Sequence, residues 1–206
     1  MEMRQLAIAL EDFRTKVGNG QYPPDSADDP EAVKQFLANA FPQYHGGLPE
    51  KYKSLDAASS LVFWLGGMTD KDGKPIGFSV DQKNPFDTAN PSRITPPFDF
   101  DVKRLRYDSG LPVYLPLGND AQSDPYVYFR ADAKGEYRGA WKNCRPCRES
   151  SNGGWVSPKS YQIFNPGLDG KYGCGVQYPS GTDYDAQRKD DMSSFSNGLT
   201  LGDDMP

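Results

Sequence analysis

Oxygen-bearing side chains gather in two segments near the C-terminus, and their types are those that a calcium ion prefers. An apolar, strand-like run over 161–164 leads into the turn Gly167-Leu168-Asp169-Gly170. Further along, Lys189–Phe195 supplies two carboxylates followed by two hydroxyls. Carboxylate, hydroxyl and backbone oxygens on glycine-rich loops are typical ligands of this hard cation. The residues that we expect to bind Ca²⁺ are Asp169, Asp190, Asp191, Ser193 and Ser194.

Taken alone, this acidic tract is more typical of a solvated loop than of a metal site. Asp183 and Asp185 lie between the two segments and are rival ligands on spacing. The rest of the chain therefore has to supply the context in which the tract is interpreted.

Three cysteines allow three interpretations. Cys144 and Cys147 have the spacing of a redox dithiol, but loop-like residues flank them rather than a βαβ unit. Together with Cys174 and His45 they make four ligands, the number that a structural zinc site requires. A disulfide is the third interpretation, and in it Cys174 can pair with either of the other two.

Catalytic chemistry finds little support. His45 is the single histidine, so hydrolases built on a histidine base are disfavoured. Asp99 and Asp101 would share one face of a strand, but no recognisable sugar site accompanies them. We predict that the protein is not an enzyme.

Composition excludes some partners and favours an ordered domain. The net charge of −5 argues against nucleic acid, because phosphate binding needs a basic face. Aromatic residues make up 13% of the 206 residues, which is too rich for a disordered chain. The sequence shows neither an apolar run long enough to span a membrane nor a signal peptide.

The N-terminal segment has helical periodicity from its first residues. Gly18-Asn19-Gly20 ends it, since glycine readily adopts the left-handed conformation of a helix C-cap. The start at Met1 has no capping residue, which fits either an ordinary N-terminal helix that frays or a longer helix whose upstream part is missing. The apolar stripe consists of Leu6, Ala9, Leu10, Phe13 and Val17.

The middle of the chain predicts further helices and then strands. Asp29 before Pro30 marks a helix start, and a second helix is expected from Ser54 to Gly66. Residues 75–97 read as an extended loop. Helices followed by short strands are the α+β pattern. The strands are expected within 98–107, 125–131 and 155–164.

Two motifs carry a family resemblance. The helix end Gly18-Asn-Gly-Gln-Tyr-Pro23 resembles the junction after the N-terminal helix of type IV pilin-like proteins, especially type II secretion pseudopilins. The turn at 167–170 and the segment 190–195 resemble the C-terminal calcium region of the major pseudopilin. The fold that this implies is α+β, a long N-terminal helix packed on a small antiparallel sheet, with helical and loop insertions.

The resemblance implies one pilin-like domain over 1–206. In it, residues 1–18 are the C-terminal half of the N-terminal helix, 19–97 a helical and loop insertion, and 98–206 the antiparallel sheet with the acidic loop. The implied function is that of a structural subunit in a type II secretion pseudopilus or related filament, with a structural Ca²⁺.

Partners and location follow from the same resemblance. The partners would be other pilin-like subunits and the inner membrane, which a helix upstream of residue 1 would reach. The location would be the cell envelope or periplasm, or an extracellular filament, where thiols are oxidised. The alternative function is a calcium-dependent carbohydrate- or ligand-binding module of the cell envelope, which predicts an aromatic-lined cleft near the metal. A third candidate is an envelope enzyme with a loop-built site, which would need a deep pocket holding perturbed acids.

Overall fold

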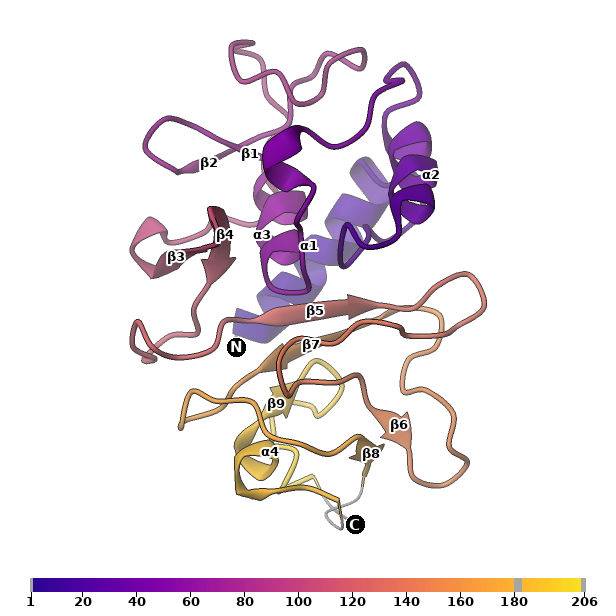
Figure 1. Ribbon diagram of the computed structural model, residues 1–206, viewed down its shortest axis with the longest axis vertical. Coiled ribbons are helices and arrows are strands. Elements are labelled where there is room, and N and C mark those ends of the chain that lie inside the picture. The colour runs from indigo at the N-terminus through magenta and orange to yellow at the C-terminus, as the bar shows by residue number, and fades with distance from the viewer. Residues whose placement is uncertain (1, 180–182, 205–206) are drawn as a thin grey trace. The chain divides into compact units, whose positions relative to one another are not determined.

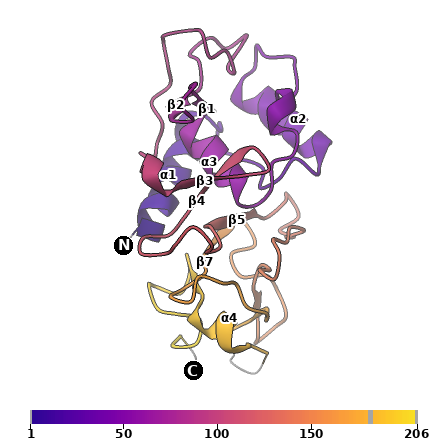
Figure 2. The same ribbon diagram turned by 60° about the vertical axis from the view of Figure 1, so that its left-hand side comes forward.

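The computed structural model describes residues 2–179 and 183–204, which form two compact units. The helical unit comprises Gln5–Tyr114. The C-terminal unit comprises Met1–Arg4 together with Leu115–Pro206. Each unit contains both helix and strands, which Figures 1 and 2 show from two sides.

Three helices form the centre of the helical unit (Figure 1). They are α1 (Glu2–Lys16, of which residues 5–16 belong to this unit), α2 (Pro30–Ala40) and α3 (Ser59–Gly66). Short 3-10 turns occur at Glu50–Tyr52 and Val102–Arg104.

Local sequence signals explain where two of these helices begin. Asp29 accepts a hydrogen bond from the Ala32 N–H at the start of α2, with Pro30 in the first turn, as predicted. The α3 helix begins at Ser59 rather than at Ser54. The reason is that the Asp56 carboxylate accepts from the Ser59 N–H and holds the preceding residues in a turn.

Two antiparallel hairpins complete this unit. In one, β1 (Met68–Thr69) pairs with β2 (Pro75–Gly77). In the other, β3 (Leu105–Asp108) pairs with β4 (Leu111–Tyr114), and β4 packs on α3. Ser109 and Gly110 have φ values of 51° and 83°, the left-handed conformation that a two-residue hairpin turn needs.

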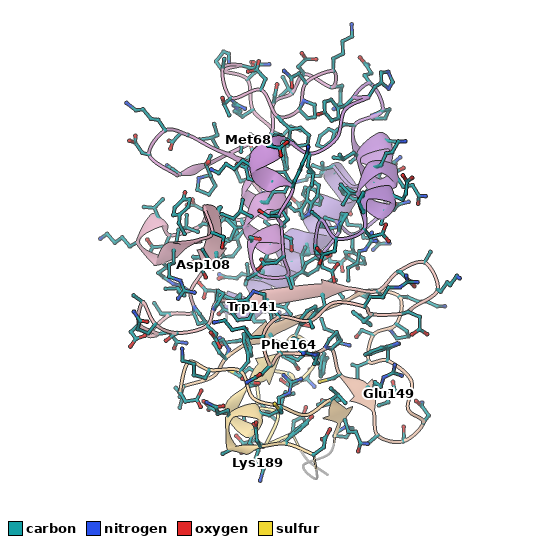
Figure 3. All side chains as sticks on the ribbon, viewed as in Figure 1. Met68, Asp108, Trp141, Glu149, Phe164 and Lys189 are labelled. Atoms are coloured by element: carbon teal, nitrogen blue, oxygen red, sulfur yellow. The ribbon has the colours of Figure 1, made fainter. Side chains whose placement is uncertain are left out.

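A three-stranded antiparallel sheet forms the core of the C-terminal unit (Figure 1). Its order is β5 (Val127–Arg130), β7 (Tyr161–Asn165) and β9 (Met192–Ser193), with Phe164 opposite Val127 on one side and Ser193 on the other. Phe164 is fully buried and is labelled in Figure 3. The unit also contains a parallel pair, β6 (Arg148–Glu149) with β8 (Gln177–Tyr178), and the short helix α4 (Ala186–Asp190).

The expected architecture, a long N-terminal helix packed on a small antiparallel sheet, is wrong. Over the described residues the fold mixes four short helices with sheets of two or three strands, and α1 has 15 residues. The predicted apolar stripe of α1 is buried, and at Phe13 the contacting rings come from helices. The Phe13 ring lies 6.2 Å from that of Phe36 in α2 and 6.1 Å from that of Trp64 in α3.

Within 2–179 and 183–204, none of the helices has both the length and the apolar character needed to cross a bilayer.

Candidate functional site

The Asp190 carboxylate holds the turn between Gly167 and Gly170. Its Oδ2 atom accepts hydrogen bonds from the Leu168 N–H at 2.6 Å and the Asp169 N–H at 2.9 Å. Asp190 is the last residue of α4 and is half-buried, whereas Asp169 is exposed. The two halves of the acidic tract are therefore in direct contact, through a carboxylate and two backbone amides.

Glycine is required at position 167 for two reasons. Its φ is +69°, a conformation that residues with a side chain rarely adopt. In addition, a Cβ atom at this position would overlap both the carboxylate and the carbonyl oxygen of Asp190. The close approach of Asp190 to the turn thus depends on the absence of a side chain.

A second loop supports the far end of the same turn. The Gly170 carbonyl accepts from the Asp124 N–H at 2.8 Å, and a Cβ atom at Gly170 would overlap the Ser123 side chain. Asp120 accepts from the Ser123 hydroxyl at 3.1 Å and from the Gln122 N–H at 2.8 Å. These N–H and O–H donors lower the pKa of Asp120, the Gln122 amide most strongly.

The two predicted serine ligands lie in or next to β9. Ser193 is buried, and its hydroxyl has no hydrogen-bond partner among the described residues. The Ser194 hydroxyl accepts from the Ile163 N–H at 3.1 Å, while the Ser194 N–H donates to the Ile163 carbonyl at 2.9 Å. Ser194 therefore extends the contact between the C-terminal segment and β7.

Asp191 lies in a buried ion pair. Its Oδ2 atom is 3.2 Å from Nη1 of Arg188, and neither side chain has exposed surface. The Gly173 N–H donates to the same oxygen at 3.3 Å, whereas Oδ1 has no partner among the described residues. Burial raises the pKa of the Asp191 carboxyl, whereas the Arg188 guanidinium and the Gly173 N–H lower it and favour the charged form.

Arg188 also contacts two of the cysteines. Its Nη2 atom is 3.0 Å from Sγ of Cys147, and Nη1 is 3.8 Å from Sγ of Cys144. Nη2 also donates to the Arg145 carbonyl at 3.1 Å, and the guanidinium lies over the Phe164 ring at 4.8 Å. Arg188 carries no sequence signal of this role, because an arginine among acidic residues is ordinarily part of a solvated segment.

The five predicted calcium ligands have different partners in the structure. Asp169 and Asp190 meet at the turn, Asp191 is paired with Arg188, and Ser194 is engaged by β7. No three His, Cys, Asp or Glu side chains in the described parts of the chain are grouped as a metal site would require. In this region, hydrogen bonds connect the segment 188–194 to the turn at 167–170 and to β7, and the ion pair of Arg188 with Asp191 lies within that segment. Calcium binding remains a prediction.

Each unit has a hollow large enough to be compared with a ligand site. The helical unit has a cavity of about 490 Å³ lined by residues of 27–53, among them His45, Leu37 and Lys34, and none of its lining residues is aromatic apart from that histidine. The C-terminal unit has an open groove of about 550 Å³ beside Trp155. There Arg148 covers the indole at 3.7 Å. Neither is the aromatic cleft that a carbohydrate module would need beside the acidic tract.

Comparison with known proteins assigns the chain to no family, because no protein-family model, curated protein or solved structure matches it.

Proposed function

We propose that this protein is a structural subunit of a type II secretion pseudopilus or a related type IV pilin-like filament. The observation that supports the proposal is the contact between the two halves of the C-terminal motif. Asp190 is bonded to the turn at 167–170, and β9 pairs with β7 directly before that turn. Segments that the resemblance identifies separately are thus parts of one local structure.

The chemistry of this local structure suits a structural role. The carboxylate of Asp190 is occupied by backbone amides, and that of Asp191 by a buried guanidinium. Carboxylates used in this way stabilise a loop rather than transfer protons to a substrate. The proposal rests on the motifs and on this contact. It takes nothing from the helix-on-sheet architecture, which the structure does not have.

The partners would be other subunits of the filament and the inner membrane. Membrane contact would come from a hydrophobic helix encoded upstream of residue 1. The C-terminal loop, held to the turn at 167–170 by Asp190 and to β7 by Ser194, would then present one constant surface to neighbouring subunits.

The experiment begins with the gene sequence upstream of the Met1 codon. We expect it to encode a short leader and a hydrophobic helix that is continuous with residues 2–16. The full-length product, expressed in a bacterium with a type II secretion system, should be shortened by the prepilin peptidase and fractionate with the inner membrane. An inactive peptidase strain is the control. A gene without a hydrophobic segment at this place would refute the proposal.

A further inference from the structure

Two of the three cysteines are buried side by side against one cation. Cys144 and Cys147 are 0% exposed, and their sulfur atoms contact the two terminal nitrogens of the same guanidinium, that of Arg188. Sulfur atoms that share one small planar group occupy neighbouring positions. Both are free thiols in the structure.

Backbone contacts fix both ends of this short segment. Cys144 and Trp141 exchange two hydrogen bonds, with the Cys144 N–H 2.8 Å from the Trp141 carbonyl and the reverse contact at 3.1 Å. At the other end, Gln162 of β7 accepts from the Cys147 N–H at 2.6 Å and donates to its carbonyl at 3.1 Å. The backbone at Cys147 is therefore held by β7, and that at Cys144 by a two-bond contact within its own turn.

Cys174 has a different environment. It is exposed, and its backbone N–H donates to the Asp185 carboxylate at 2.9 Å. The space against the other two sulfurs is filled by Arg188, whose positive charge would repel a zinc ion at that place. The geometry thus separates a buried pair from an exposed single thiol.

We propose that Cys144 and Cys147 form an intrachain disulfide when the protein folds under oxidising conditions, and that Cys174 remains a free thiol. A small disulfide such as oxidised glutathione supplies the oxidising equivalent. One cysteine thiolate attacks it, which breaks its S–S bond and releases one glutathione thiol. The second cysteine then displaces the other glutathione. One S–S bond forms and one breaks, and two protons and two electrons pass to the glutathione pair.

The order of events follows from burial. In the folded protein, burial raises the pKa of both thiols. The Arg188 guanidinium acts in the opposite direction, but burial has the larger effect. A buried and protonated thiol is a poor nucleophile. The bond therefore forms before the segment is covered, and afterwards it is protected from reductants.

The disulfide would stabilise the buried position of the Arg188 side chain, which contacts both sulfur atoms. This residue lies in α4, and α4 ends at Asp190, the residue that holds the turn at 167–170. A bond between the two cysteines would hold the segment 144–147 in place, and Arg188 of α4 contacts this segment. The inference is independent of the proposed filament role, since it concerns only folding in the presence of an oxidant.

The sequence makes the test direct. Trypsin cleaves after Lys142 and Arg148 but not between Arg145 and Pro146, so both cysteines lie in the peptide 143–148. Cys174 lies in the separate peptide 172–188. The reduced, unfolded protein is refolded in a glutathione buffer, denatured, alkylated without reduction, digested and analysed by mass spectrometry.

We expect the peptide 143–148 to be unalkylated and lighter by two hydrogens, and the peptide 172–188 to carry one alkyl group. The Cys174→Ser variant should give the same form of 143–148. In the Cys147→Ser variant, Cys144 should be alkylated. Two alkyl groups on 143–148 would overturn the proposal, and so would a disulfide between 143–148 and 172–188 or between two copies of the chain.

Discussion

The Arg188 guanidinium and the Asp191 carboxylate form an ion pair without exposed surface, 3.2 Å apart and three residues apart in the chain. Arg188 lies inside α4, and Asp191 is the residue that ends this helix before β9. The pair thus fixes the angle at which the chain leaves the helix and joins the sheet. Removing two charges from water is costly, so such a pair specifies this connection more than it adds net stability.

Removal of the cation should be strongly destabilising. In Arg188→Met the Asp191 carboxylate stays buried without its partner, and we expect the free energy of unfolding to fall by about 3–5 kcal/mol. Urea denaturation followed by circular dichroism measures this. The double variant Arg188→Met/Asp191→Leu should recover a large part of the loss, because no uncompensated charge remains.

Lys189→Met is the matched control, since Lys189 is exposed and adjacent in sequence. It removes a positive charge from the same helix and should change the unfolding free energy by less than about 0.5 kcal/mol. Equal effects of the two substitutions would show that the buried pair has no special role.

Asp190 should be needed to keep the turn at 167–170 closed. In Asp190→Ala the N–H groups of Leu168 and Asp169 lose a charged acceptor, which we expect to cost about 1–3 kcal/mol of stability. The local consequence is faster tryptic cleavage after Lys171 in the otherwise folded protein. Unchanged cleavage in Asp190→Ala would mean that the turn is held by other contacts.

Gly167 offers a separate test of the same contact. Gly167→Ala introduces both a strained backbone and an overlap with Asp190, whereas Gly153→Ala introduces the strain alone. The φ values are +69° and +71°, and nothing lies within 4 Å of a Cβ atom at Gly153. We expect Gly153→Ala to cost about 1–2 kcal/mol and Gly167→Ala clearly more, in the same urea titration. Similar losses would argue against the close packing of Asp190 on the turn.

Some elements could be predicted because their signals are local. The start of α2 at Pro30 is set by an adjacent capping residue, and β5 by a continuous run of aromatic and β-branched residues. The architecture could not be predicted in this way. A stripe such as Leu6 to Phe13 shows that one face of a helix is buried, but helices and sheets can cover it equally well.

The candidate site was predictable only in part, for the same physical reason. Spacing and turn chemistry placed Asp190 near the turn that contains Asp169. Nothing in the local sequence distinguishes the buried Arg188 from an exposed arginine. Its burial depends on Cys144 and Cys147, which are 44 and 41 residues away along the chain.

The loop that supports Gly170 should weaken in acid. The amide and hydroxyl donors at Asp120 lower its pKa in the folded state below the value of about 3.9 in the unfolded chain. The stability that this carboxylate contributes is therefore present above about pH 4 and is lost as the pH falls through the folded-state pKa. In urea titrations, the midpoint difference between the wild type and Asp120→Ala should shrink as the pH is lowered from 6 to 3. A difference that grows on acidification would contradict this assignment.

Calcium binding at the acidic tract is tested by thermal unfolding. A cation bound only to the folded state stabilises it, and at a hundred times the dissociation constant the melting temperature should rise by about 5–10 °C. A chelator should reverse the rise. Asp169→Ala and Asp190→Ala should each abolish the response. Asp99→Ala, which removes one exposed charge in the helical unit, should retain it. If calcium leaves the melting temperature of the wild type unchanged, the turn is held by the hydrogen bonds of Asp190 without a metal, and the predicted site does not exist.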